Sequence, residues 1–515
     1  MASASPSIEI PVPRGGHRPD ADPYEIGFKA LTQAENWIYR DGEYRVRPGY
    51  AAFATDINQR PTSYFQYLHQ DGALRTIKGT TVGWWKFNSG GNSWTDISGT
   101  ALTASPTQQQ IFRAFQKSGA TWLLGTNGAD SPKKWDGLTA TYVDMGGTPP
   151  QARAMMVLFD RILLGNLLSG STVSGSAVDV SANKDFDSGW GGTAQTEILT
   201  DTPGEIVSMM EMGILQGAIL KSDAIYNAIA IASTSPFRFE IKDILSKGDV
   251  ESGPASAALV IQLSEGLIWW LGKDGACYAY DGIAVTQLPY RIQKRITDTA
   301  NFASLSRAWG FYDRQRRHAW FIYPETDQTD PNIGVVINRD TFEMYPIRWS
   351  TLRPTAGGKL DTATGITIGE AVGTLGASLL TIGEYRNTTP RIIIGDKDGQ
   401  AFYETGFSDN GVAIPHFSET GLDGTTERFI TVQEIEHRLA KAAAAQSLTV
   451  KLGKANYGET RVLGSGFTLA VGSAGPYVSG HRDTGKYFSL RLEGDSSQLV
   501  HWKGALAYLA KRGKR

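Results

Sequence analysis

LIWWLGKDGACYAYDG, residues 267–282, carries the pattern that decides the fold. Two runs of apolar and aromatic residues flank the pair Asp274-Gly275, and a second Asp-Gly pair follows the second run. Asp-Gly pairs supply the positive φ angles that two-residue hairpin turns require. Aromatic and β-branched residues suit the pleated, half-buried surface of a strand. The stretch therefore predicts a β-hairpin.

The same pattern recurs between residues 60 and 406, with two strand-like runs around a short turn in each copy. The further copies are SYFQYLHQDGALRTIKGTTVGWWKF (63–87), IFRAFQKSGATWLLGTNGADSPKKWDG (111–137), MMVLFDRILLGNL (155–167), GAILKSDAIYNAIAI (217–231), AWGFYDRQRRHAWFIYP (308–324) and RIIIGDKDGQAFYETG (391–406). A period of about 40–50 residues built from small antiparallel sheets is typical of a β-propeller.

We therefore predict an all-β chain in which residues 61–406 form a β-propeller-like domain of six to seven degenerate blades. One blade cannot bury both faces of its sheet, whereas a ring of blades can, and the ring leaves few open edges. A stack of β-sandwich domains is the alternative architecture.

The segments on either side of this domain differ from it in pattern. Residues 1–28 are rich in Pro, Ser and Gly, which predicts an extended N-terminal arm. Residues 407–427 break the repeat and predict a linker or long loop. Strand-like alternation resumes afterwards, as in YFSLRLE (487–493), so residues 428–515 are predicted to form a separate small β-domain.

Composition excludes several classes of protein. The chain has 515 residues and a formal net charge of −2, without the basic excess that a sequence-wide electrostatic grip on nucleic acid requires. DNA could still pass such a protein without being held tightly. Cys277 is the only cysteine, which excludes an intrachain disulfide and a zinc site built from several thiolates. No apolar stretch approaches the ~18 residues that a membrane-spanning helix needs, and the N-terminus has no apolar secretion signal.

Enzyme signatures are also missing from the sequence. There is no phosphate-binding G-x-x-x-x-G-K-[ST] motif and no G-x-S-x-G nucleophile motif. The seven histidines are scattered, and no two of them have the i, i+3 or i, i+4 spacing of a helix-borne metal site. We therefore expect no catalytic residue, no cofactor and no metal, and we expect that the chain is not an enzyme.

Two features leave a glycan-directed alternative open. Paired carboxylates could serve a glycosidase, and the candidates are Asp185, Asp187, Asp274 and Asp281. The doublets Trp84-Trp85 and Trp269-Trp270 could stack on sugars. Because adjacent strand residues point to opposite faces, only one member of each doublet could face a ligand. Turn formation and core packing are the simpler interpretations.

Four stretches resemble the tail nozzle, or tail hub, proteins of short-tailed bacteriophages (podoviruses), the packaged-DNA stabilisation or tail tubular protein B type. They are ALTQAENWIYRDGEYRVRPGYAAFA (30–54), FDRILLGNL (159–167) with the following DVSANKDFDSGW, LIWWLGKDGACYAYDG (267–282) and TGKYFSLRLEGDSSQLVHWKGALAYLAKRGKR (484–515). The first contains the motif Asn-x-x-x-x-Asp-Gly-x-x-x-x-Arg-Pro-Gly-Tyr, from Asn36 to Tyr50. Residues 350–390 have no counterpart in this family pattern.

The resemblance implies a structural protein of the virion tail. Such a chain forms a ring of six subunits below the portal and the head-to-tail adaptor protein. The ring continues the DNA channel, retains the genome with a needle or gate protein, seats the tail fibres or spikes, and lets double-stranded DNA pass without tight sequence-specific binding. Residues 29–60 would be an N-terminal platform segment, and residues 428–515 would contribute to the same platform. The alternative is a propeller surface or tail protein that binds host glycans, with glycosidase or depolymerase activity as a variant.

The resemblance also directs attention to candidate interface residues. In the N-terminal platform segment they are Trp37, Arg45, Arg47 and Tyr50, of which Arg45 and Arg47 share one strand face. At the C-terminus they are Lys511, Arg512, Lys514 and Arg515. The basic C-terminus is either a solvated end or a segment that docks into an acidic groove of a neighbouring subunit. Surfaces that line the DNA channel are expected to be acidic or neutral.

Overall fold

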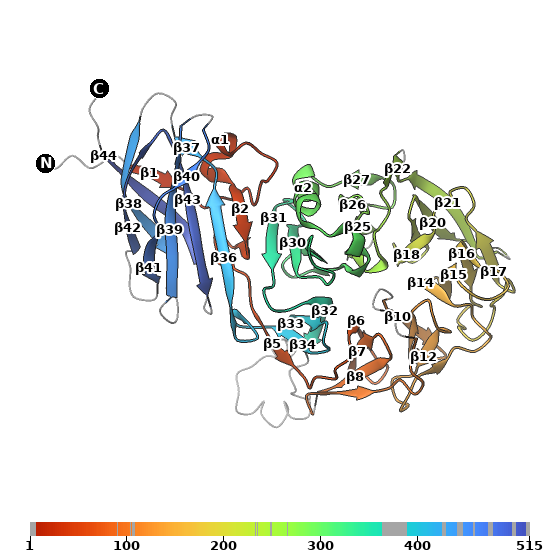
Figure 1. Cartoon of the computed structure of the whole chain (residues 1–515). Coiled ribbons are helices and arrows are strands. Elements are labelled where there is room, and N and C mark those ends of the chain that lie inside the picture. Colours follow the sequence, from red (N-terminus) through yellow and green to blue (C-terminus); the bar gives the residue numbers. More distant parts are fainter. Residues whose placement is uncertain are drawn as a thin grey trace, which may run out of the picture.

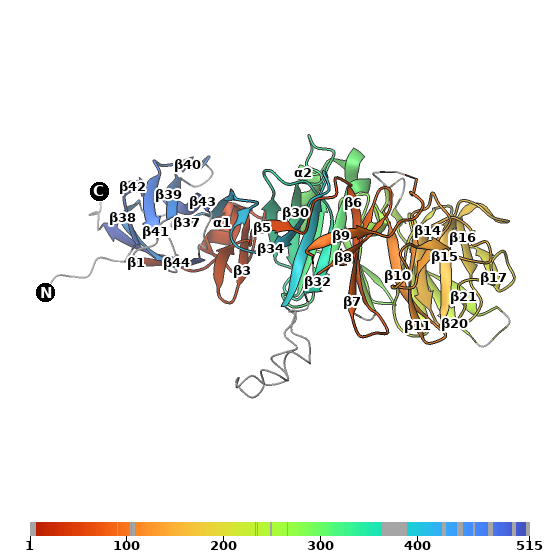
Figure 2. The same ribbon diagram turned by 90° about the horizontal axis from the view of Figure 1, so that it is seen from below.

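The computed structural model describes residues 7–510 apart from 90, 104, 106–108, 232, 234, 248–249, 265, 363–388, 425–428, 440–445, 457–458, 472–476 and 497–500. These residues form an all-β structure in which small sheets are arranged as a β-propeller (Figure 1). A second β-structure, made from both ends of the chain, lies beside the propeller in both views (Figures 1 and 2).

Six separate four-stranded antiparallel sheets form six blades, each built from four consecutive strands. The first three are β6 (Pro61–Leu68), β7 (Leu74–Thr80), β8 (Trp84–Asn88) and β9 (Ser93–Asp96); β10 (Ile111–Lys117), β11 (Ala120–Thr126), β12 (Lys133–Trp135) and β13 (Val143–Asp144); and β14 (Ala152–Leu158), β15 (Arg161–Leu167), β16 (Ser174–Val180) and β17 (Gln195–Ile198). The next three are β18 (Ile206–Glu211), β19 (Gln216–Lys221), β20 (Ala224–Ala230) and β21 (Phe237–Ile244); β24 (Val260–Ser264), β25 (Leu267–Leu271), β26 (Cys277–Tyr280) and β27 (Val285–Gln287); and β28 (Trp309–Asp313), β29 (His318–Tyr323), β30 (Ile333–Asn338) and β31 (Met344–Arg348).

Each pair of neighbouring blades shares an apolar core, as the closure argument requires. Trp269 and Trp270 show how strand alternation builds these cores, because the two indoles enter different ones. Trp269 packs between its own blade and the β28–β31 blade, whereas Trp270 packs against the β18–β21 blade. The hairpin from which the fold was predicted therefore buries aromatic residues on both of its faces.

The ring is closed by a strand from the other end of the chain. β32 (Pro354–Thr362), β33 (Thr389–Asp396) and β34 (Ala401–Glu404) pair in that order, and β34 pairs with β5 (Tyr50–Phe53) from the N-terminal region. β32 lies beside both β28 and β6, so these four strands fill the sector between the last blade and the first. The last sequence copy, residues 391–406, forms β33 and β34 of this closing sector. This explains why the sequence predicted six to seven blades.

The strands near the two chain ends form what we call the terminal β-domain, a pair of facing sheets. One sheet contains β1 (Ser7–Ile10), β3 (Trp37–Arg40), β4 (Glu43–Val46), β38 (Ile430–Leu439), β42 (Tyr477–Gly485) and β44 (His501–Ala510). The other contains β2 (Leu31–Glu35), β36 (Val412–Thr420), β37 (Asp423–Gly424), β39 (Gln446–Ala455), β40 (Val462–Leu463), β41 (Phe467–Val471) and β43 (Tyr487–Ser496), and it continues through β35 (Ser408–Asp409) into the closing sector. One buried cluster joins both sheets to the last blade.

Two of the expected segment types differ in the structure. Residues 407–427 are not a linker, because β36 runs through them and pairs with β43 and β2 in the terminal β-domain. The described part of residues 1–28 is not a simple extended arm either: β1 pairs with β44, and the helices α1 (Pro23–Ile26) and η1 (Gly27–Lys29) follow. Segment 29–60 is divided, since β2–β4 join the terminal β-domain while β5 closes the propeller.

The remaining elements are short. They are β22 (Ser246–Lys247), β23 (Val250–Glu251), η2 (Ala257–Leu259), α2 (Tyr290–Thr299) and η3 (Phe302–Arg307). Among the helices that the described residues form, none has the length and hydrophobicity to cross a membrane.

Candidate functional site

The side chain of Arg47, one of the interface candidates from the sequence, is buried within the chain. Its side chain is 1% exposed, and its guanidinium donates to both carboxylate oxygens of Asp409, at 2.9 Å from Nη1 and 2.5 Å from Nη2. Nε donates to Asn36 Oδ1 at 3.0 Å, and Nη2 also donates to the Arg348 carbonyl at 2.9 Å. Arg47 directly follows β4, and these contacts join it to Arg348 of β31 and Asp409 of β35, so Arg47 holds the terminal β-domain against the propeller.

Asn36 organises the same junction from the turn between β2 and β3, where its φ of 61° is in the left-handed region. Its Oδ1 also accepts from the Arg348 backbone N–H at 2.8 Å, and its Nδ2 donates to the Pro415 carbonyl at 2.7 Å. Asn tolerates the left-handed conformation better than most residues do. The Asn and Arg of the Asn-x-x-x-x-Asp-Gly-x-x-x-x-Arg-Pro-Gly-Tyr motif are therefore hydrogen-bonded to each other.

Trp37 and Tyr50, the two aromatic interface candidates, are also buried. Trp37 packs edge-on against His416 and Tyr44 in the shared core, with ring centroids 5.2 and 6.5 Å apart. The Arg47 guanidinium lies 5.9 Å from the Tyr50 ring centroid and 5.3 Å from the Trp349 ring centroid. Burial raises the pKa of Tyr50 well above its usual value. Trp37, Arg47 and Tyr50 thus form an internal junction, and their side chains are buried within the chain.

Arg45 is the one N-terminal candidate with access to solvent. Its side chain is 30% exposed and pairs with Glu43 at 2.6 Å and with Asp41 at 3.6 Å. Arg45 and Arg47 line the same small cavity, as expected for alternate residues of one strand face. Lys511, Arg512, Lys514 and Arg515 lie outside the described residues.

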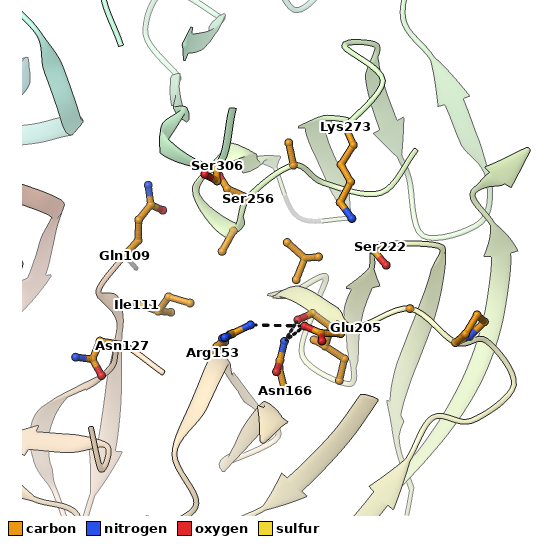
Figure 3. A pocket seen from close by; sticks show the side chains of 16 residues that line it. Gln109, Ile111, Asn127, Arg153, Asn166, Glu205, Ser222, Ser256, Lys273 and Ser306 are labelled. Carbon is orange, nitrogen blue, oxygen red and sulfur yellow. Dashed lines mark hydrogen bonds and ion pairs between the residues drawn. The ribbon is translucent and has the colours of Figure 1, made fainter. Parts of the chain in front are cut away.

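A larger cavity of about 650 Å³ lies on the propeller axis (Figure 3). Its lining comes from the starts of the innermost strands and from the turns after the second strands, and Figure 3 shows Arg153, Asn166 and Glu205 converging on it. Arg153 lies 3.6 Å from Glu205, and Asn166 Nδ2 donates to the Ile206 carbonyl at 2.9 Å and to Glu205 Oε2 at 3.3 Å.

The chemistry of this axial cavity is polar and mixed in charge. Among the described residues that line it, Glu205 is the only carboxylate and none is aromatic. A glycosidase needs a pair of carboxylates around the scissile bond, and sugar binding commonly relies on an aromatic surface. The axial cavity therefore offers a place for a small polar ligand without the two features expected of a glycan site.

The proposed glycosidase carboxylates are engaged elsewhere. Asp185 and Asp187 both accept from Lys117, and Asp187 also pairs with Lys134 at 2.7 Å. Although desolvation acts in the opposite direction, the hydrogen bonds from Lys117, Ser188 and the backbone lower the pKa of Asp185 to about 2. A carboxyl with such a pKa stays ionised at neutral pH and is poorly suited to be a general acid.

Asp274 and Asp281 hold turns. Asp274 accepts from the Ala276 N–H at 3.0 Å and from the Tyr278 hydroxyl at 2.5 Å. Asp281 accepts from the Ile283 and Ala284 N–H groups at 2.9 Å, and these bonds lower its pKa. Both patterns are the side-chain-to-backbone bonds of Asp in tight turns.

The tryptophan doublets are mostly part of the interior. Trp84, Trp269 and Trp270 are fully buried, and only Trp85 has partial access to solvent. Cys277 is buried, which raises the pKa of its thiol. Within the described part of the chain, no group of three or more His, Cys, Asp or Glu side chains could hold a metal ion.

Large apolar side chains gather at hairpin tips on the face opposite the axial cavity. The innermost strands begin at that cavity, so the turns after the first and third strands of each blade lie at the other face. These turns, in five successive blades, carry the exposed residues Leu68, Leu138, Phe159, Ile214 and Ile283, of which the last two are 84% and 81% exposed. We call this set the apolar tips.

Neither family models nor curated proteins give a match to this chain. Among solved structures it is similar to the computationally designed Ika8 protein, with a TM-score of 0.38 and 10% identity over 69% of this chain and 99% of that one. It is also similar to Chaetomium thermophilum Raptor (TM-score 0.42, 7% identity, 70% of this chain and 29% of that one). The extracellular domain of the one-component system BT4673 from B. thetaiotaomicron gives a TM-score of 0.42 and 10% identity over 90% of this chain and 62% of that one. Likeness at this level says nothing of function.

Sequence reasoning found part of the junction and missed the rest. Asn36 and Arg47 were visible within one motif, but Asp409 lies 362 residues from Arg47, in the segment expected to be a linker. Arg153 and Glu205 of the axial cavity carried no sequence signal, because each lies at the start of an ordinary blade.

Proposed function

We propose that this chain is a structural subunit of the virion tail of a short-tailed phage, of the tail nozzle type. In this proposal several copies, six by resemblance, form a ring below the adaptor protein, and the DNA channel runs along the axis of that ring. The observation that carries the proposal is the terminal β-domain, in which strands from both chain ends are interleaved and joined to the propeller through buried contacts.

This architecture suits a mechanical role. The Arg47–Asp409 pair, the Asn36 hydrogen bonds and one continuous apolar core connect the two parts of the chain, so force on one part is transmitted to the other. Buried polar networks that are well satisfied favour a single rigid arrangement. A subunit under the pressure of packaged DNA needs such rigidity.

The charge of the chain fits the passage of DNA. With 50 basic and 52 acidic residues, a ring of these subunits carries no overall attraction for the phosphate backbone. Each phosphate contact would have to break as DNA slides, and tight contacts would slow ejection. We therefore propose that the channel surface is acidic or neutral and that basic residues lie at protein interfaces.

The apolar tips supply a surface for neighbouring proteins. Ile214 and Ile283 lie on adjacent blades. These two blades are in contact near the tips, since Asn227 of β20 donates to the carbonyl of Gly282, next to Ile283, at 3.4 Å. Large apolar side chains gathered on one face favour a protein contact, since water contact with them is unfavourable. We propose that the seats for fibres, spikes or adjacent subunits include this face.

The test is the mass of the native assembly. The purified protein is examined alone and together with an adaptor protein of a short-tailed phage, by native mass spectrometry and by electron microscopy. A closed ring, alone or on the adaptor, supports the proposal. A monomer under both conditions contradicts it, and binding of the monomer to a host polysaccharide would favour the glycan-binding alternative.

A double variant sharpens this test. Ile214→Asp with Ile283→Asp places charges on the apolar tips without touching the junction, and Asp298→Asn on the exposed face of α2 serves as the matched control. We expect the double variant to weaken the attachment of the next tail component or of the neighbouring subunit, while the control assembles as the unchanged protein does. If the double variant and the control assemble equally well, the apolar tips are not an attachment surface.

A further inference from the structure

The sequence contains two Asn-Gly pairs, Asn127-Gly128 and Asn410-Gly411. Asparagine is a thermolabile residue, because the main-chain nitrogen of the next residue can attack its side-chain amide. A following glycine favours this attack, since it has no side chain to hinder the close approach. The structure places the two pairs in different surroundings, and only one of them leaves the reacting groups open.

Asn410-Gly411 is the turn of the β35–β36 hairpin. Asp409 and Val412 pair on either side of it, and Asn410 and Gly411 have φ angles of 50° and 84°. Two positive φ angles are typical of the two-residue type I′ turn, which Asn-Gly suits. β36 begins at this turn, where the terminal β-domain meets the closing sector of the propeller (Figure 1). A chemical change in the turn would therefore act on the junction between the two parts of the chain.

The reacting groups of this turn are open to water. Asn410 and Gly411 are both exposed, and a Cβ placed on Gly411 would have nothing within 4 Å. The Asn410 main-chain N–H donates to the Tyr50 carbonyl at 2.6 Å. In the part of the chain that the structure describes, neither the Asn410 side-chain amide nor the Gly411 nitrogen has a hydrogen-bond partner. Neither group has to break a hydrogen bond before the two can react.

Asn127 shows the opposite arrangement. It is 6% exposed, and its Nδ2 donates to Asp130 Oδ2 at 2.7 Å. Its Oδ1 accepts from the main-chain N–H groups of Ala129 and Asp130 at 3.0 and 2.9 Å. This side chain forms a tight turn with its own backbone. All three hydrogen bonds hold its amide, so Asn127 is protected although its sequence context is the same.

We propose that Asn410 is a site of spontaneous deamidation. The Gly411 main-chain nitrogen attacks Cγ of Asn410 and forms an N–Cγ bond, the Cγ–Nδ2 bond breaks, and Nδ2 leaves as ammonia with the proton of the attacking nitrogen. One water molecule then opens the resulting succinimide ring. Opening at the Cγ–N bond gives aspartate, whereas opening at the main-chain carbonyl gives isoaspartate. This modification goes beyond the proposed function and does not depend on a virion role.

Both products weaken the junction. Each adds a carboxylate next to Asp409, whose own carboxylate is 1% exposed and paired with Arg47. Isoaspartate also inserts an additional carbon atom into the main chain of a two-residue turn. Because turn length fixes the register of a hairpin, Asp409 and Val412 can then no longer pair as they do here.

Peptide mapping tests the site on the purified protein, which is incubated at pH 8, sampled over days and digested with trypsin. Asn410 is the only asparagine of the tryptic peptide 398–428, and Asn127 is the only asparagine of the peptide 118–133, which serves as the internal control. We expect the amide-to-acid mass shift to appear about tenfold or more faster in peptide 398–428, because Asn127 must first release its hydrogen bonds. Equal rates in the two peptides, or no shift in peptide 398–428, would overturn the proposal.

A variant identifies the reacting residue and its effect on the junction. Asn410→Gly leaves a Gly-Gly pair, which a type I′ turn accepts, and has no amide to lose. Asn92→Gly is the matched control, since Asn92 also has a positive φ angle, 44°, but lies in the turn before β9 of the first blade. Incubation should lower the melting temperature of the unchanged protein and of Asn92→Gly, but not that of Asn410→Gly. A mass shift in peptide 398–428 that persists in Asn410→Gly would refute the site, and an unchanged melting temperature of the deamidated protein would refute its effect on the junction.

Discussion

Arg47 and Asp409 form a two-pronged ion pair with both side chains 1% exposed, although 362 residues separate them in the sequence. Arg47 follows β4 of the terminal β-domain, and Asp409 lies in β35 between that domain and the closing sector of the propeller. The pair therefore connects the two parts of the molecule at the point where the chain passes from one to the other.

Removing one member of this pair should be severe. Arg47→Met leaves Asp409 buried without its partner, and breaking a buried pair in this way costs about 3–5 kcal/mol. We expect a drop of this order in the free energy of unfolding measured by urea denaturation. Arg438→Met removes an exposed pair and should cost less than about 1 kcal/mol.

The double variant Arg47→Met/Asp409→Leu separates charge burial from packing. If the cost of Arg47→Met comes from the orphaned carboxylate, the double variant should be more stable than the single one, because coupled neighbours are not additive. A double variant that is as unstable as the sum of the two single variants would show that the ion pair itself is not what the junction depends on.

Gly49, next to the ion pair, is predicted to tolerate no side chain. A Cβ at this position would lie 2.2 Å from the Ser408 carbonyl oxygen and 2.3 Å from the Ser408 nitrogen. Backbone atoms cannot move aside as a flexible side chain can, so Gly49→Ala should push β35 away from the junction. Overpacking of this kind costs about 1–3 kcal/mol or more. Thermal unfolding measures the loss.

Gly480 provides the control for this substitution. It lies in β42 of the same terminal β-domain, and nothing is within 4 Å of a Cβ placed there. Gly480→Ala should leave the melting temperature nearly unchanged or raise it slightly. Equal melting temperatures for the two alanine variants would contradict the close approach of Gly49 and Ser408.

Three buried histidines should make the protein less stable as the pH falls below neutral. Burial lowers the pKa of His17 and His437 to about 3 and that of His318 to about 4. Between the folded-state values and the unfolded value of about 6.5, the unfolded chain binds protons that the folded chain excludes. Stability therefore rises with pH over this range, by up to about 1.4 kcal/mol per pH unit for each histidine.

The measurement is the urea midpoint between pH 7 and pH 4. His437→Gln removes one titrating group and retains an amide that can bond to Ser479, to which His437 Nε2 is hydrogen-bonded at 2.8 Å. This variant should show a shallower pH dependence than the unchanged protein. A midpoint that rises on acidification would contradict the burial of neutral imidazoles.

Asp185 should stabilise the protein only while it is ionised. Its pKa is lowered to about 2, so the contribution is fully present above the unfolded value of about 3.9 and is lost as the pH falls through the folded value. Asp185→Asn should lower the melting temperature modestly at pH 7, since partly exposed pairs contribute about 1 kcal/mol or less. The difference from the unchanged protein should vanish near pH 2, and the exposed Asp298→Asn gives the background.

Local patterns in the sequence were sufficient to predict the propeller, but they did not predict the contacts between the propeller and the terminal β-domain. Asp274-Gly275 and the alternation of Trp269 and Trp270 carry hairpin information within a few residues, and the structure confirms the all-β propeller. The pairing of β36 with β43 and β2 depends on contacts among residues about 70 to 390 positions apart, and the turn-forming residues around it suggested a loop. The burial of Arg47 could not be predicted for the same reason, because its partner Asp409 lies 362 residues away in the sequence.

The order of the chain has a consequence for synthesis on the ribosome. β5 is synthesised well before β34, with which it pairs to close the ring, and β1 and β4 are synthesised well before their partner β44. A nascent or prematurely terminated polypeptide thus keeps unpaired strand edges at its N-terminal end, where chaperones and proteases can recognise them. Only a polypeptide translated through β44 can pair these edges, so folding of the terminal β-domain signals that translation has passed this strand.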